Sequence, residues 1–119
     1  MKIAISCQGK DLSSSVDPRF GRAAGFIIYD TETENFDYIT NEQNLNAAQG
    51  AGIQTAQNVA KSGAQAVITG HVGPKAFSAL KAGKIDIYLG ANQSVQESIQ
   101  AFKNGDLKAA DQADKPGHW

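Results

Sequence analysis

The fold is decided by residues 66–77, which read AVITGHVGPKAF. The first three, Ala66–Ile68, form a continuous apolar run of the kind found in strands that are covered on both faces. Gly73 and Pro74 then predict the start of a helix, because proline at the first helical position lacks an N–H that would have no helical partner. A buried strand followed closely by a helix favours an α/β protein with parallel strands.

Toward the C-terminus the alternation of helix and strand continues. The helix after Pro74 is expected to end at Gly83, and residues 85–89 then predict a strand. Ser94 and Glu97 have the spacing of a capping box, which predicts a third helix with its end at Gly105. Parallel strands connected through helices form right-handed crossovers.

Toward the N-terminus, three strands and a helix precede the deciding stretch. Residues 3–5 and 26–29 are apolar blocks, and residues 36–38 alternate as a half-exposed strand does. A connection of about five residues between the second and third blocks predicts an antiparallel hairpin. The helix that follows is expected to bury the apolar residues that recur at helical spacing, and these are Ile53, Ala56, Val59 and Ala60.

The predicted order of elements is therefore β–β–β–α–β–α–β–α. This order indicates the α/β class: a five-stranded mixed sheet, antiparallel in its first three strands and then parallel, with helices on both faces. Residues 1–108 are expected to form one domain, and residues 109–119 a polar tail that contains His118 and Trp119.

Composition excludes several classes of function. With 119 residues and a formal net charge of −1, the chain has no basic field to hold a nucleic acid. No apolar run approaches the roughly 20 residues that span a bilayer, and the N-terminus does not resemble a signal peptide. We expect a cytoplasmic protein with neither a nucleic acid nor a membrane as its partner.

A long loop, residues 8–24, joins the first two predicted strands. Connections of about seventeen residues are uncommon in compact domains and are more often functional than idle. The loop carries both arginines of the chain, Arg19 and Arg22, beside Gly21. Two guanidinium groups near a glycine and several hydroxyls predict an anion site. The alternative is that each arginine pairs with a surface carboxylate such as Asp17.

The turn from Gly70 to Lys75 is the second candidate. It follows the carboxyl end of a predicted parallel strand and opens a helix, where α/β sheets bind ligands and a helix N-terminus attracts anions. Its glycines would allow close approach to the backbone, and His71 would lie beside the ligand. The alternative is a tight strand-to-helix turn with a surface histidine.

Cys7 ends the first predicted strand and is the only cysteine. One thiol with His71 and His118 cannot build a closed zinc site, which takes four protein ligands. A buried small hydrophobe is the ordinary interpretation, and a weak ligand at the rim of a site is the alternative. The sequence has no paired carboxylates, no phosphate-binding loop and no dinucleotide-binding fingerprint, so we do not expect an enzyme.

Several of these segments match the motifs of a known family. Residues 16–23, VDPRFGRA, followed by 26–30, FIIYD, resemble the Phe-Gly-Arg signature of the dinitrogenase iron–molybdenum cofactor biosynthesis family. That family includes NifX-like proteins and the C-terminal part of NifB. Residues 50–53, GAGI, and 68–77, ITGHVGPKAF, resemble its other two motifs, and residues 105–107 resemble its close. The resemblance covers nearly the whole chain.

The resemblance implies a ribonuclease H-like fold without the nuclease carboxylates. It also implies non-catalytic binding or carriage of an anionic molybdenum-containing metal–sulfur cluster, of Mo–Cu–S or Mo–Fe–S type, or of thiomolybdate. Protein partners in cluster assembly or delivery follow from the same resemblance. The residues expected to hold the cluster are Arg19, Phe20, Gly21, Arg22, Gly70, His71, Val72, Gly73 and Lys75, with His71 and Cys7 as candidate metal ligands.

Arg19 departs from the family pattern, because many members have a histidine just before Phe-Gly-Arg. A guanidinium donates hydrogen bonds to sulfide but is not an ordinary metal ligand, so the change favours electrostatic capture over coordination. Two other functions use the same site. One is a phosphate- or nucleotide-binding enzyme with His71 as its general base. The other is a regulatory module that binds a partner protein through an exposed apolar patch.

Overall fold

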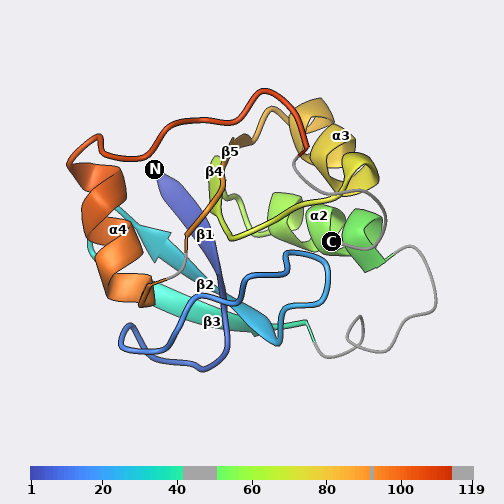
Figure 1. Cartoon of the computed structure of the whole chain (residues 1–119). Helices are drawn as coiled ribbons and strands as arrows, with labels where there is room; N and C mark the ends of the chain where they lie inside the picture. Colours follow the sequence, from blue (N-terminus) through green and yellow to red (C-terminus); the bar gives the residue numbers. More distant parts are fainter. Residues whose placement is uncertain (42–50, 92, 114–119) are drawn as a thin grey trace.

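The computed structural model describes residues 1–41, 51–91 and 93–113. Within these ranges the order of elements is the predicted one (Figure 1). The strands are β1 (Lys2–Cys7), β2 (Gly25–Asp30), β3 (Phe36–Thr40), β4 (Ala66–Ile68) and β5 (Asp86–Tyr88). The helices are α2 (Ala51–Lys61), α3 (Pro74–Ala82) and α4 (Val95–Lys103).

The five strands form one sheet in the order β3-β2-β1-β4-β5. β1 pairs antiparallel with β2, with Ile5 opposite Ile27, and parallel with β4, with Ile5 opposite Ile68. β3 adds to β2 in antiparallel orientation and β5 adds to β4 in parallel orientation. The mixed sheet predicted from the sequence is confirmed.

Helices cover both faces of this sheet (Figure 1). On one face, Ala4 of β1 packs in a cluster with Val59 of α2 and Leu80 of α3. On the other face, Ile5 of β1 packs in a second cluster with Ile99 of α4. Neighbouring residues of one strand point to opposite faces, so β1 is buried on both, as its continuous apolar run predicts.

The start of α4 confirms the predicted capping box. The Ser94 hydroxyl accepts the Glu97 N–H at 3.1 Å, and the Glu97 carboxylate accepts the Ser94 N–H at 3.1 Å. The bond from the Ser94 N–H is the largest cause that lowers the pKa of Glu97. Removal of such a cap usually costs about 1 kcal/mol. The N-terminus of α4 therefore already binds a carboxylate, that of Glu97.

The apolar face expected for α2 is only partly correct. Ala56 and Val59 are buried, but Ile53 is 37% exposed and Ala60 is also exposed. Thr55 occupies the inner face instead, where its hydroxyl lies 3.3 Å from the Asn41 side-chain oxygen. A hydroxyl can be buried without loss when it finds an acceptor, which periodicity alone does not indicate.

Residues 109–113, expected to belong to a polar tail, contact the sheet instead. Ala109 forms an antiparallel bridge with Tyr88, and the Ala110 N–H donates to the Ile87 carbonyl at 2.7 Å. Ala110 and Ala113 pack against the cluster that contains α2 and α3. Backbone pairing along β5 therefore extends the folded part beyond the predicted boundary at 108. Residues 114–119, with His118 and Trp119, lie outside the described residues.

Within the described ranges, none of the helices has the length and apolar character that crossing a membrane requires.

Candidate functional site

The carboxyl ends of the three parallel strands define one edge of the sheet, where ligands bind in many α/β proteins. β1, β4 and β5 end there at Cys7, Ile68 and Tyr88. The loop of residues 8–24 runs along this edge and is held to its neighbours. Short bridges join Val16 to Cys7 and Ser15 to Ser94. The long loop is therefore part of the folded scaffold.

A third bridge joins the two predicted site segments. Arg19 pairs with His71 in parallel register, with hydrogen bonds from the Phe20 N–H to the His71 carbonyl (3.2 Å) and from the His71 N–H to the Pro18 carbonyl (2.7 Å). Side chains at paired positions project to the same side, and those of adjacent residues to the other. Arg19 and His71 thus share one side, while Phe20 points the opposite way into the core.

The two arginines have different environments. Arg19 is exposed, and among the residues that the structure describes its guanidinium has no ion-pair or hydrogen-bond partner. Arg22 is half-buried and already has a partner within the fold. His71 is also half-buried and has an interaction of its own in addition to the backbone bonds. Of these three groups, Arg19 is therefore the one best placed to meet an external anion.

Asp17 binds the main chain of this turn. It is 6% exposed, and its carboxylate accepts the Arg19 N–H at 3.1 Å and the Ala24 N–H at 3.4 Å. These two bonds connect the ends of the segment that carries both arginines. For Arg19, the alternative of an ion pair with Asp17 is replaced by a main-chain hydrogen bond. The Arg19 guanidinium is not the group that Asp17 binds.

The N-terminus of α3 lies directly after the bridged segment. Its N-cap is Gly73, which has extended backbone (φ −81°, ψ 169°) and provides no side-chain cap. The first-turn N–H groups of a helix carry positive partial charge and favour an anion. Lys75 is exposed in the same turn. At the N-terminus of α4, the positive potential is offset by the carboxylate of Glu97. The Gly73 N-cap of α3 provides no such group.

Gly70 has a packing role that the sequence analysis did not anticipate. A Cβ at this position would lie 2.7 Å from both the Cα and the carbonyl oxygen of Pro18. Real side-chain carbons do not approach backbone that closely, so only glycine lets the two segments pair. Its lack of a side chain serves the contact between segments, and the expected close approach of a ligand is not what requires it.

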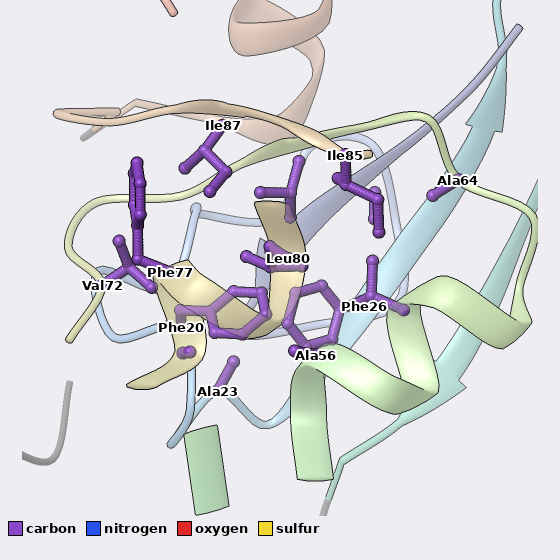
Figure 2. Packing of buried hydrophobic residues seen from close by; sticks show 14 of the residues in the cluster. Phe20, Ala23, Phe26, Ala56, Ala64, Val72, Phe77, Leu80, Ile85 and Ile87 are labelled. Carbon is purple, nitrogen blue, oxygen red and sulfur yellow. The ribbon is translucent and has the colours of Figure 1, made fainter. Parts of the chain in front are cut away.

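Among the expected site residues, Phe20, Gly21 and Val72 are buried. Phe20 and Val72 are both 0% exposed and pack in the cluster beneath α2 and α3, where Figure 2 shows the Phe20 ring beside that of Phe26. The two rings meet edge to face, with centroids 5.4 Å apart. Gly21 is buried as well, and its carbonyl oxygen lies 3.4 Å from the Thr55 hydroxyl. These residues support the site from below.

Cys7 lies in the core, so the expected position at the rim is wrong. It is 0% exposed within the cluster that α4 covers. Burial raises the pKa of its thiol to about 11, against the opposing effect of hydrogen bonds from the Ile27 and Gly9 backbone. Metal ligation uses the thiolate, which this environment disfavours. The ordinary interpretation of a buried small hydrophobe is the one that fits.

Ionisation of Cys7 is expected to destabilise the folded protein at high pH. The unfolded thiol ionises near pH 9, while the folded thiol keeps its proton up to about pH 11. Below pH 9 both states are protonated and the full stability is present; above it, ionisation favours the unfolded state. Denaturant titrations from pH 8 to 11 should show a loss up to roughly 2 kcal/mol larger in wild type than in Cys7→Ala. Equal losses in the two proteins would contradict this assignment.

Metal coordination by the chain has little support among the described residues. No group of three or more histidine, cysteine, aspartate or glutamate side chains is placed there to hold a metal ion. Of the two expected metal ligands at this edge, Cys7 is fully buried and His71 is half-buried. The site, as far as it is described, offers cations and N–H donors, which suit a ligand with its own negative charge.

Sequence reasoning missed the buried polar groups behind the site. Ser6 and Thr69 are both 0% exposed, and their hydroxyls lie 2.7 Å apart. The sequence contained one signal for them among the described residues: Ser6 lies near the end of the apolar strand β1, and Thr69 directly follows the apolar strand β4. Residues 42–50 lie outside the described residues.

Comparison with known proteins places this geometry in a family. The model of the dinitrogenase iron-molybdenum cofactor family matches residues 1–105. An uncharacterised protein of Methanocaldococcus jannaschii is 35% identical over 111 residues, which cover 91% of this chain and 90% of that protein.

Two solved structures are similar over almost their full length. The apo form of the orange protein from Desulfovibrio gigas has a TM-score of 0.94 at 42% identity, with 96% of each chain covered. A Thermotoga protein described as NifB-like has a TM-score of 0.84 at 39% identity, with 98% of each chain covered. From the family match and these identities, the chain belongs to the dinitrogenase iron-molybdenum cofactor family.

Proposed function

We propose that this protein binds and carries an anionic, molybdenum-containing metal–sulfur cluster without catalysing a reaction. The observation that carries the proposal is the in-register bridge between Arg19 and His71. It pairs Arg19, which is exposed and whose guanidinium has no partner among the described residues, with the segment that leads into α3, where the Gly73 N-cap provides no side-chain cap. Family membership and the similarity to the orange protein support a cluster as the ligand.

The chemistry of the site fits capture of a complete anion. Arg19 would donate hydrogen bonds to sulfides on the cluster, and the first turn of α3 would add N–H donors and positive potential. Such charge-assisted bonds are roughly twice as strong as neutral ones. The cluster would bring its own sulfide ligands, so that His71 is a hydrogen-bond donor or at most one weak ligand.

The proposal includes the finer expectations that came from the family resemblance. These are a Mo–Cu–S or Mo–Fe–S composition, partners in cluster assembly or delivery, a cytoplasmic location and a ribonuclease H-like architecture. The sheet of three antiparallel strands followed by parallel ones supports the last of these.

Titration with tetrathiomolybdate, alone and then with a copper(I) salt, tests the proposal. We expect saturable changes in the visible spectrum, and molybdenum that co-elutes with the protein in gel filtration. Lys61→Gln is the matched control for replacement of the site arginines, because it removes an exposed cation at the C-terminal end of α2. Wild-type protein that binds neither form, at low salt, would rule the proposal out.

The same titration separates the proposal from a phosphate- or nucleotide-binding enzyme. The N-terminus of α3, to which the Gly73 N-cap provides no side-chain cap, also suits a phosphate group. Phosphate and a nucleoside triphosphate are therefore added as competitors at matched ionic strength. Displacement of tetrathiomolybdate by either at low concentration would favour the enzyme, and a turnover assay of His71→Ala would follow.

A further inference from the structure

A pair of buried hydroxyls lies at the junction of β1, β4 and the arginine-bearing loop. Ser6 is the penultimate residue of β1, and Thr69 follows the last residue of β4, 63 positions further along the chain. Both side chains are 0% exposed. The Ser6 Oγ lies 2.7 Å from the Thr69 Oγ1 and 2.7 Å from the carbonyl oxygen of Asp17.

The direction of the two hydrogen bonds follows from the chemistry of the groups. A carbonyl oxygen only accepts, so the single proton of the Ser6 hydroxyl must go to Asp17. The Ser6 oxygen is then the acceptor for the Thr69 hydroxyl. The result is a chain from Thr69 to Ser6 to the main chain of Asp17, in which each bond polarises the next.

This chain holds Asp17 from two sides, and Asp17 in turn holds Arg19. The Asp17 N–H donates to the Ser6 carbonyl at 2.9 Å, so both main-chain groups of Asp17 are bound to Ser6. The Asp17 carboxylate accepts the Arg19 N–H at 3.1 Å. Between them stands Pro18, whose ring restricts φ and whose carbonyl binds the His71 N–H.

Thr69 connects the same chain to the rest of the edge. Its N–H donates to the Tyr88 carbonyl at 3.0 Å, and its carbonyl accepts the Ala91 N–H at 3.2 Å. Its position is therefore fixed by the strand and loop on its other side. Through its hydroxyl, Thr69 can therefore hold the loop in a fixed position relative to the sheet.

We infer that Thr69 and Ser6 are positioning residues, which fix the main chain of Arg19 so that its guanidinium is presented to the anion. The inference rests on the proposed function. Such positioning would favour binding, because the Arg19 side chain is long and an anchored main chain lowers the ordering cost of binding. A pair that merely filled the core could be apolar, as the neighbouring residues on β1 and β4 are.

A double-mutant cycle tests this inference. Thr69→Val removes the donor with little change of shape, Thr69→Ser restores it, and Arg19→Gln removes the group on which the hydroxyl chain should act. We expect Thr69→Val to weaken tetrathiomolybdate binding by about fivefold to tenfold in the wild-type background. In the Arg19→Gln background the same change should cost less than about twofold. Equal losses in both backgrounds would overturn the inference.

Hydrogen exchange gives a readout that does not need the ligand. In Thr69→Val the N–H groups of Arg19 and His71 should exchange faster than in wild type, and Thr69→Ser should restore their protection. Ser98→Ala is the matched control, because Ser98 is a buried hydroxyl with no hydrogen-bond partner among the described residues. It should change neither exchange at Arg19 nor binding.

The outcomes separate the two proposals. If wild-type protein does not bind tetrathiomolybdate, the proposed function fails, and the exchange data alone decide whether the hydroxyls fix the main chain of Arg19. If wild type binds but Thr69→Val leaves both binding and exchange unchanged, the inference fails and the proposed function stands.

Discussion

Replacement of Arg19 and Arg22 by glutamine is expected to weaken tetrathiomolybdate binding by about 30- to 1,000-fold. Each charge-assisted bond that is lost should reduce the binding free energy by roughly 1–2 kcal/mol, because water screens exposed charged groups. Arg19 is exposed beside the His71 bridge, and Arg22 follows on the same turn. Isothermal titration or the visible spectrum gives the affinity of each variant.

The two single variants should differ in kind. Arg19→Gln is expected to account for most of the binding loss without a change of stability, because its guanidinium has no partner among the described residues. Arg22→Gln should also lower the free energy of unfolding, because the Arg22 side chain is half-buried and its apolar stem packs against its surroundings. Arg19→Lys keeps the charge but loses the planar fork, and should be intermediate. Full affinity in Arg19→Gln would remove Arg19 from the site.

Replacement of Phe20 by alanine is expected to lower the free energy of unfolding by about 3–5 kcal/mol. The side chain is 0% exposed, its ring packs edge to face with that of Phe26, and its truncation would leave a cavity between them (Figure 2). Stable domains typically have only about 5–15 kcal/mol in total, so this single change endangers folding. Urea denaturation gives the value, and Phe20→Leu is the variant to use if Phe20→Ala does not fold.

Phe36→Ala is the matched control for this prediction. Phe36 lies on the edge strand β3 and is 40% exposed, so the same truncation should cost about 1 kcal/mol or less. If both alanine variants were equally stable and only Phe20→Ala lost binding, the Phe20 side chain would be a ligand contact instead of core.

Together these two predictions separate ligand contact from structural support within one short motif. Arg19 and Phe20 are adjacent in sequence, yet the bridge to His71 turns one outward and the other inward. The family motif therefore contains two kinds of residue. Arg19 is exposed and would meet the proposed anion, whereas Phe20 is buried and packs in the core.

Local patterns allowed the elements and their order to be predicted. The apolar runs at β1 and β4, the capping box at Ser94 and Glu97, and Pro74 at the start of α3 are confirmed. These signals act between residues a few positions apart, through caps, fixed dihedrals and side-chain periodicity, so a single sequence contains them. The same locality explains the misjudged face of α2, where the hydroxyl of Thr55 is satisfied by the distant Asn41.

The sequence by itself determined that the chain is an α/β protein with an arginine-bearing loop and a glycine-rich turn at strand ends. The two segments were expected to share one site, but only the tertiary structure decided how they pair, with Gly70 against Pro18 and Arg19 beside His71. It also decided that Cys7 is core. The physical reason is that hydrogen bonds and close packing between segments depend on which backbones meet, and such contacts leave no local periodicity in the chain.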